Sequence, residues 1–229
     1  MKKYLKMLET IALFNGIDRD NFETLLHCLK AKIVYYNKDD IIFMTGEKIN
    51  NLGIVLSGQV QIIQNDYYGN KCIISNAEVG QLFGESFAFA NTKSLPFSIH
   101  AVDKCDVLFI DCRALITTCK ESCDFHHRLI FNMLNIVAQK NIALTEKIEF
   151  ISKRTTREKL VAYLSAQAQK SQSDKFSIPF NRQGLADYLN VDRSAMSWEL
   201  CKLRNDGFLK FSKNKFQLLD VKQGDGSLV

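Results

Sequence analysis

The alternation of apolar and polar positions defines the first part of the chain. From about Lys32 to Asp111 the pattern has period two, and short β-rich runs such as "GIVL", "QVQIIQ", "KCIIS" and "DVLFID" follow one another. Turn signals separate them at intervals of roughly ten residues, at "NKDD", "TGE", "LSGQ", "YYGN" and "EVGQ". Evenly spaced short strands with no helical pattern between them predict a β-barrel of the jelly-roll type.

The next stretch, from Asp124 to Lys153, has the pattern of one long helix without proline or glycine. Its seam residues alternate at spacings of four and three: Ile130, Leu134, Val137, Asn141, Leu144, Ile148 and Ile151. A helix of about 30 residues is about 45 Å long, more than a small barrel can cover. We therefore expect a two-stranded coiled coil with a second copy, with Asn141 helping to set the register. The alternative is a helix packed wholly on its own barrel.

The last part of the chain reads as helical and then as strands. "TTRE" fits a capping box with Thr155 as N-cap and Glu158 at the third position, which predicts a helix to about Ala168. The polar run "QKSQSD" predicts a loop, and "GFLKF" and "KFQLLD", joined by "SKN", predict a hairpin. The whole chain is thus predicted to be α+β, with a barrel in 1–123, a long helix in 124–153 and a third domain in 154–229.

The stretch "RQGLADYLNVDRSAMSWELCKLRNDG", residues 182–207, predicts two short helices joined by a tight turn. Ala186 is small where the helices must cross, Asn190 tolerates the left-handed conformation of a turn, and Asp192 is a natural N-cap. An apolar face on each helix comes from Leu185, Tyr188, Leu189, Met196, Leu200 and Leu203. These features predict a helix-turn-helix, and a plain helical hairpin with a packing role is the alternative.

The apolar face of the second helix leaves Arg193, Ser194, Ser197 and Trp198 on the exposed side of its N-terminal half. In a helix-turn-helix these positions meet base edges in the major groove. Trp198 is the only tryptophan of the chain. Because tryptophan is mostly buried on average, a core position for Trp198 is the competing interpretation.

Charge adds weight to the third domain. Of the 30 Lys and Arg and 25 Asp and Glu, residues 153–229 hold 14 and 8, a net +6, while residues 1–152 have a net −1. A local positive excess attracts a phosphate backbone, although a basic solvated surface is also common. The composition, 46% hydrophobic and 24% charged, is typical of a globular protein. We expect a cytoplasmic location, because no signal peptide and no apolar run long enough to span a membrane are present.

These elements, in this order, resemble the Crp/Fnr family of bacterial transcription regulators over nearly the whole chain. The most specific segments are "GQLFGESFAFA" (80–90), similar to the family's phosphate-binding cassette, "TEKIEFISKRTTREKLVAYL" (145–164) and "NRQGLADYLNVDRSAMSWEL" (181–200). The resemblance implies a jelly-roll effector domain, a dimerisation helix and a winged helix-turn-helix. It also implies a homodimer on a palindromic site in double-stranded DNA, RNA polymerase as a partner, and control by a small-molecule effector, without catalysis.

The same resemblance implies two groups of functional residues. Those implied to contact DNA are Arg182, Gln183, Asp192, Arg193, Ser194, Ser197, Trp198, Lys202 and Lys213. Those implied to line the effector pocket are Phe83, Gly84, Glu85, Ser86, Leu95, Pro96, Phe97, Leu144 and Thr145.

The effector positions depart from the cyclic-AMP-binding members of the family. There, the Gly-Glu of the cassette is followed by an Arg-Ser pair whose arginine neutralises the cyclic phosphate. Here Gly84 and Glu85 match, but the pair reads Leu95-Pro96, and Leu144 replaces a threonine that meets the base. A buried phosphate without a cation would be poorly solvated. We therefore expect an effector other than cyclic AMP, less anionic or partly apolar, given Phe87, Phe89 and Phe97.

Cysteines offer a different kind of sensor. The chain has seven at scattered spacings and no CxxC pair, which favours reduced thiols over a disulfide framework. An iron–sulfur cluster of the Fnr type would need several N-terminal cysteines, and the first 70 residues contain only Cys28. "CKESCDFHHRL" places Cys119, Cys123, His126 and His127 at helical spacing, which would suit a metal, haem or redox sensor, or simple packing with solvent-facing histidines. The sequence assigns no cofactor.

Two other classes of function stay open. One is a cyclic-nucleotide-binding module without DNA binding, which would leave the basic third domain unexplained. The other is an enzyme using the Cys/His group, for which the chain shows no Gly-x-Ser-x-Gly, Walker loop or His-Glu-x-x-His motif.

Overall fold

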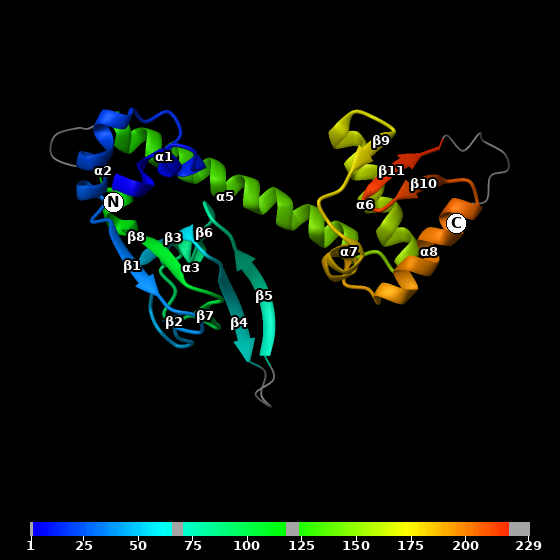
Figure 1. Ribbon diagram of the computed structural model, residues 1–229, viewed down its shortest axis with the longest axis horizontal. Helices are drawn as coiled ribbons and strands as arrows, with labels where there is room; N and C mark the ends of the chain where they lie inside the picture. Colours follow the sequence, from blue (N-terminus) through cyan, green and yellow to red (C-terminus); the bar gives the residue numbers. More distant parts are fainter. Residues whose placement is uncertain (1, 66–70, 118–123, 220–229) are drawn as a thin grey trace. The chain divides into compact units, whose positions relative to one another are not determined.

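The computed structural model describes residues 2–65, 71–117 and 124–219 (Figure 1). The chain forms two compact units, Met1–Ala138 and Gln139–Val229. Their boundary lies within the long helix α5 (Asp124–Ile151), so each unit contains one part of that helix. The α+β class predicted from the sequence is confirmed.

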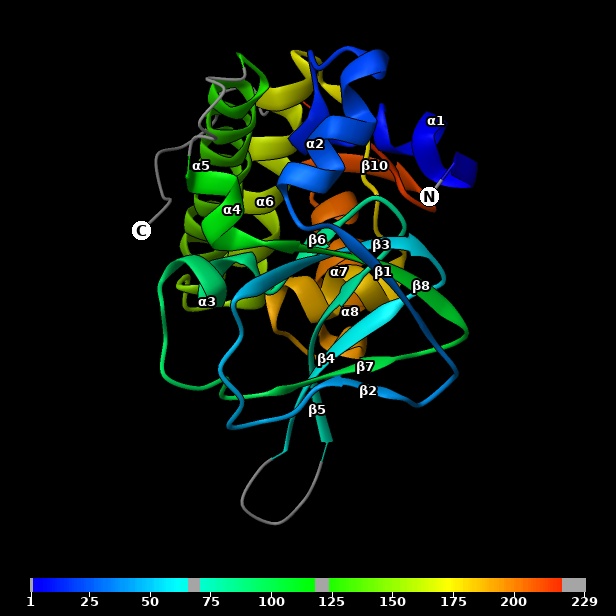
Figure 2. The same cartoon turned by 90° about the vertical axis from the view of Figure 1, so that its left-hand side faces the viewer.

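The first unit contains two four-stranded antiparallel sheets, ordered β1-β8-β3-β6 and β2-β7-β4-β5 (Figure 2). The strands are β1 (Lys32–Tyr36), β2 (Ile41–Phe43), β3 (Asn51–Ser57), β4 (Val60–Asn65), β5 (Lys71–Ala77), β6 (Leu82–Phe83), β7 (Ser98–Ala101) and β8 (Cys105–Asp111). Residues from both sheets share one apolar core, as in a jelly roll. The turn predicted at "YYGN" lies outside the described residues. Three of the other four turn signals fall between strands, and "LSGQ" starts in the last two residues of β3 and ends before β4.

Strand β8 shows how the period-two pattern builds two cores at once. Val107 and Phe109 point into the core between the sheets, whereas Leu108 and Ile110 join a second core on the opposite face. Successive side chains of a strand point to opposite faces, so a continuous apolar run indicates a strand covered on both sides. The second cover consists of helical segments.

The long helix α5 contributes Leu129 and Met133 to this cover, and the short helices of the cover were not predicted from the sequence. The short helices of the unit are α1 (Leu5–Leu8), α2 (Phe22–Cys28), α3 (Glu85–Phe89) and α4 (Cys112–Ile116). Helices of four to seven residues are too short to show a helical period in a window of 11 to 18 residues, which explains the omission.

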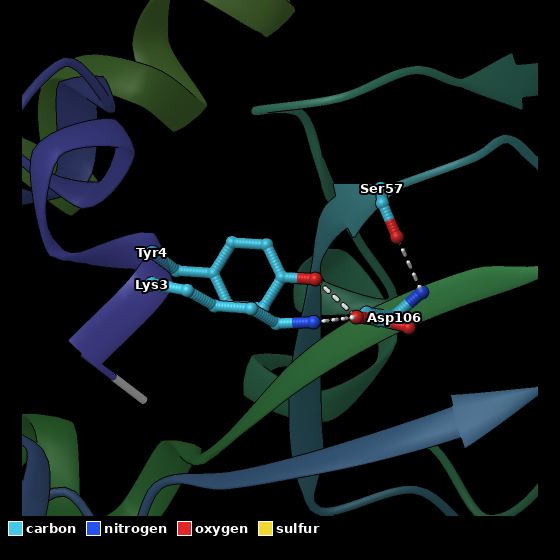
Figure 3. A network of polar contacts seen from close by, with 4 residues as sticks. All are labelled: Lys3, Tyr4, Ser57 and Asp106. Atoms are coloured by element: carbon cyan, nitrogen blue, oxygen red, sulfur yellow. Dashed lines mark hydrogen bonds and ion pairs between the residues drawn. The ribbon is translucent and has the colours of Figure 1, made fainter.

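Polar contacts fix the N-terminal segment to β8 (Figure 3). The Tyr4 hydroxyl and the Lys3 amine, the latter at 3.1 Å, both donate to the Asp106 carboxylate. The Asp106 backbone N–H donates to Ser57 Oγ at 3.2 Å. Burial raises the pKa of the Asp106 carboxyl, but the hydrogen bonds from Tyr4 and Lys3 outweigh it and hold that pKa below its ordinary value.

The second unit begins with the C-terminal part of α5 and contains α6 (Thr156–Ser171), α7 (Arg182–Leu189) and α8 (Arg193–Asn205). A three-stranded antiparallel sheet, ordered β10-β11-β9, consists of β9 (Lys175–Ser177), β10 (Leu209–Ser212) and β11 (Lys215–Leu218). The predicted hairpin is confirmed as β10 and β11, which we call the wing.

Three features of this unit concern where its helices and strands begin and end. The capping box is confirmed: the Thr155 hydroxyl accepts from the Glu158 N–H, and the Glu158 carboxylate accepts from the Thr155 N–H. Helix α6 ends at Ser171 and not near Ala168, with Gln172 in the left-handed conformation (φ 49°). Strand β9, which directly follows the predicted polar loop, was missed, since three residues carry too little pattern to identify a strand.

Candidate nucleic-acid interface and effector site

The turn between α7 and α8 has the geometry expected of a helix-turn-helix. Ala186 is fully buried, Asn190 has φ 51°, and the Val191 N–H donates to the Ala186 carbonyl at 3.0 Å. Asp192 Oδ1 accepts from the Ala195 N–H at 2.8 Å, which confirms its role as N-cap of α8. Helix α6 supports the turn through Lys159, whose Nζ lies 3.4 Å from the carbonyl oxygens of Leu189 and Asn190.

Helix α8 buries one face and presents the other. Met196, Leu200 and Leu203 are fully buried, as predicted. On the other side Arg193 and Ser194 are exposed and Ser197 is half-buried. Trp198 is 62% exposed, with Lys202 Nζ 5.1 Å from the centre of its ring system. The interpretation of Trp198 as a core residue is therefore wrong.

The start of α7 places its candidate DNA contacts differently. Asn181 caps the helix, its side chain accepting from the Gly184 N–H at 2.8 Å. Gln183 is exposed, and its Nε2 donates to Asp187 Oδ1 at 2.8 Å. Arg182 is half-buried, with Cζ 4.7 Å from the centre of the Phe211 ring on the wing. Lys213, also a candidate, is exposed in the wing's turn, where its φ is 54°.

The cassette lies at the start of α3. Gly84 has φ 78°, and a Cβ there would lie 3.1 Å from Ile49 Cδ1, so both conformation and space favour glycine. Glu85 is buried, and the exposed Ser86 donates through Oγ to Glu85 Oε1 at 3.2 Å. Phe83, just before the cassette, is buried in the core between the two sheets.

Leu95 stands at the position where the cyclic-AMP-binding members of the Crp/Fnr family, which the sequence resembles, have the arginine that neutralises the cyclic phosphate. Its side chain is 1% exposed. Its N–H donates to the Glu47 carbonyl at 2.8 Å, and its own carbonyl accepts from the Gly46 N–H at 2.9 Å. Pro96 is exposed and Phe97 is buried. Both polar groups of the Leu95 backbone are thus bonded within the protein.

Aromatic rings surround these positions. Phe87 and Phe97 make an edge-to-face contact with ring centres 4.8 Å apart. Phe109 makes similar contacts with Phe83 at 6.3 Å and Phe43 at 5.6 Å. The interior of the barrel near the cassette is therefore apolar and aromatic. Glu85 of the cassette is the buried acidic residue among the described positions.

The predicted seam of α5 is largely open in the single chain. Leu134, Leu144 and Ile148 are each at least 60% exposed. Val137 and Asn141 are also exposed, while Ile130 and Ile151 are partly buried. Leu134 and Val137 belong to the first unit and are exposed within it, which excludes a helix packed wholly on its own barrel. Leu144 and Thr145, both candidates for the effector pocket, are exposed and belong to the second unit.

Comparison with protein families matches two segments that together cover most of the chain. Residues 33–122 match the cyclic nucleotide-binding domain, and residues 158–223 match the Crp-like helix-turn-helix domain. The first segment holds the jelly roll with its cassette, and the second holds the helix-turn-helix and wing. The chain belongs to the Crp/Fnr family of transcription regulators. It is a DNA-binding regulator with a sensor domain of the cyclic-nucleotide-binding type.

Individual relatives are distant. Human and mouse cGMP-dependent protein kinase 2 are 26% identical over 85 residues, 37% of this chain and 11% of each kinase. The chain thus corresponds to only 11% of the length of each kinase.

Solved structures of Crp/Fnr-type regulators share the fold. CLP from Xanthomonas campestris, described as c-di-GMP responsive, has 18% identity and a TM-score of 0.55 over 88% of this chain and 99% of CLP. CprK, in complex with OCPA, has 15% identity and a TM-score of 0.60 over 86% and 89%. DNR from Pseudomonas aeruginosa has 18% identity and a TM-score of 0.50 over 96% of each chain.

The Cys/His group of this Crp/Fnr regulator is only partly described. Cys119 and Cys123 lie outside the described residues, so a metal, haem or redox site there stays untested. His127 is exposed, as expected, but His126 is buried, and the expectation that it faces solvent is wrong. The centre of its ring lies 5.1 Å from that of Phe125. His126 is buried because position 126 lies on the face of α5 that carries the buried Leu129 and Met133. Among the described residues, no helix is long and apolar enough to cross a membrane.

Proposed function

We propose that this regulator is a cytoplasmic homodimer that inserts the N-terminal half of α8 into the major groove of a palindromic promoter site. The observation that carries the proposal is the exposed group on α8, with Trp198 62% exposed beside Arg193 and Ser194. Side chains at these helix positions reach base edges in helix-turn-helix proteins. The proposed division of labour is an effector domain in 1–123, a dimerisation helix in 124–153 and a DNA-binding domain in 154–229, with RNA polymerase as a partner and no catalytic activity.

Base preference follows from what these side chains can do. In the two best-known branches of the family, the position of Trp198 is an arginine that reads guanine, and the position of Ser194 is a glutamate that accepts from cytosine. Here Ser194 discriminates weakly, and the indole face of Trp198 suits a thymine methyl. Arg193 can then contact a phosphate or one guanine. We infer a site with half-sites about one helical turn apart, richer in A·T at the innermost positions.

The effector is proposed to be neither cyclic AMP nor cyclic GMP. Buried Leu95, with both backbone groups bonded to the loop of Gly46 and Glu47, leaves no cation for a cyclic phosphate at that position. The aromatic contacts of Phe87, Phe97 and Phe109 favour a partly apolar ligand.

Selection of duplexes from a random DNA pool tests the DNA-reading proposal. We expect the wild type to select a palindromic motif and Trp198→Arg to gain a guanine at one symmetric position of it, because arginine can pair bidentately with guanine. Lys175→Arg, on strand β9 and outside α8, is the control and should select the wild-type motif. Identical motifs from wild type and Trp198→Arg would show that residue 198 reads no base.

A further inference from the structure

Arg182 stands out among the candidate DNA contacts because aromatic rings already cover it. Its guanidinium carbon lies 4.7 Å from the centre of the Phe211 ring and 5.4 Å from that of Phe216. Both distances lie within the range of about 6 Å for cation–π attraction. Phe211 is on β10 and Phe216 is its cross-strand partner on β11, so the first residue of α7 contacts both strands of the wing.

The end of α8 contacts the same ring. Arg204, in the last turn of that helix, has its guanidinium carbon 5.4 Å from the centre of the Phe211 ring. Phe211 is thus the point where α7, α8 and the wing meet. In the part of the chain that the structure describes, neither Arg182 nor Arg204 forms an ion pair with a carboxylate, so the rings are the contacts that hold these two cations.

The surroundings of Arg182 differ from those of a free phosphate ligand. Arg182 is half-buried, and burial lowers the pKa of its guanidinium from the ordinary value. Arg193, at the start of the next helix, is exposed. The N-terminus of α7 is also occupied, because Asn181 accepts from the Gly184 N–H. The charge of Arg182 is thus directed at the aromatic rings of the wing.

We propose that Arg182 and Phe211 form a clamp that fixes the wing to the helix-turn-helix, which makes Arg182 a positioning residue for DNA binding and not a phosphate ligand. The proposal rests on the proposed DNA-reading function of α8. A rigid wing and helix pair presents its contacts to DNA in one geometry, so loss of the clamp weakens binding without removing a charge–phosphate contact.

Salt dependence separates the two roles. We measure the affinity of the full-length protein for a duplex carrying the motif recovered by selection, by fluorescence anisotropy at several salt concentrations. Arg182→Ala is expected to lower affinity on the order of tenfold and to leave the slope of log affinity against log salt unchanged. Arg193→Ala is the matched control: removal of an exposed cation that contacts the DNA directly should reduce that slope by about 1. A slope reduced by about 1 in Arg182→Ala would overturn the clamp.

The partner residue supplies a second test. Phe211→Leu keeps an apolar side chain but removes the ring, and we expect a loss of affinity at least as large as in Arg182→Ala, because Arg204 loses the same ring. The double variant should lose clearly less than the sum of the two single losses, because both substitutions remove the Arg182–Phe211 contact. Additive losses contradict the proposal.

Arg182→Lys checks the charge alone and also covers the case in which the alanine variant fails to fold. Lysine keeps the charge but not the planar stacking group, so its affinity should stay near that of Arg182→Ala, whereas a phosphate ligand would be largely rescued. Circular dichroism confirms that each variant is folded at the assay temperature. If the wild type binds neither the selected motif nor random duplex, the proposed function fails and not the clamp.

Discussion

Leu95 is the residue with the clearest consequence for ligand choice. It is buried at the position where a phosphate-binding cation would be needed, and its N–H and carbonyl both bond to the loop of Gly46 and Glu47. We therefore expect no rise in the melting temperature of the protein with millimolar cyclic AMP or cyclic GMP. A ligand stabilises a protein in proportion to RT ln(1 + [L]/Kd), so weak binding gives no shift. A clear rise in calorimetry at millimolar nucleotide would contradict this prediction.

His126 gives a prediction for pH. Burial lowers the pKa of its imidazole from the ordinary value of 6.5, and the neighbouring His127 acts in the same direction. Its Nδ1 is buried and has no hydrogen-bond partner among the described residues. The unfolded chain therefore binds a proton at a higher pH than the folded chain. The free energy of unfolding should fall as the pH drops below about 6.5 towards the lower pKa of the folded state.

Variants isolate this contribution from other titrating groups. His126→Leu cannot be protonated, so its melting temperature should fall less than that of the wild type between pH 7 and pH 5. His27→Gln removes an exposed histidine on α2 and should follow the wild type. Equal pH dependence in wild type and His126→Leu would show that His126 does not titrate differently in the two states.

Single residues also show how far the sequence can be interpreted. Asn190, Asp192 and Thr155 were predicted correctly because their roles are local: each bonds or turns within a few residues of itself. The contact between Arg182 and Phe211 joins residues far apart in the sequence. Period-two alternation predicts on which face of its strand Phe211 lies, but not which cation contacts its ring. A contact between residues so far apart in the sequence follows only from the three-dimensional structure.

Among the elements, α6 depends most on a local signal. Thr155 and Glu158 form the capping box of its first turn. The backbone N–H groups of Thr155 and Arg154 donate to the Glu158 carboxylate, and these hydrogen bonds lower the pKa of that carboxyl against a smaller opposing effect of burial. We expect Thr155→Ala to destabilise the second unit by about 1 kcal/mol, because one N–H of the first turn loses its acceptor. Chemical denaturation measures the change. Thr156→Ala, one residue into the helix, is the control, and a loss of equal size there would contradict a specific capping effect.

The elements that the sequence left unassigned share a physical reason. Helices α1 and α2 and strand β9 each have three to seven residues, too few for a periodicity to emerge. They are held by tertiary contacts: α2 by the core beneath β8, and β9 by pairing with β11. The longest element, α5, was predicted to within two residues of its end, since 28 residues contain several full periods.

For the whole molecule, the seam of α5 is the apolar surface that a single chain leaves uncovered. Leu144 and Ile148 are exposed by 60% and 61%, and Leu134 by 63%. A stripe at alternating spacings of four and three fits the seam of a two-stranded coiled coil. The proposed palindromic site requires the same two-fold symmetry, because a dimer reads two equivalent half-sites. Assembly and DNA recognition are therefore linked predictions.

Charge placed in the seam tests that link. We expect the wild type to sediment as a dimer at micromolar concentration, and Leu144→Lys or Ile148→Lys to shift it to monomer. Two lysines that face each other across the seam would repel and lose hydration. Glu149→Lys also adds positive charge on an exposed position of α5, but outside the seam, so it should remain dimeric. The monomeric variants should in turn lose the preference for paired half-sites over a single half-site. A wild type that sediments as a monomer, or seam variants that stay dimeric, would contradict an interface formed by α5.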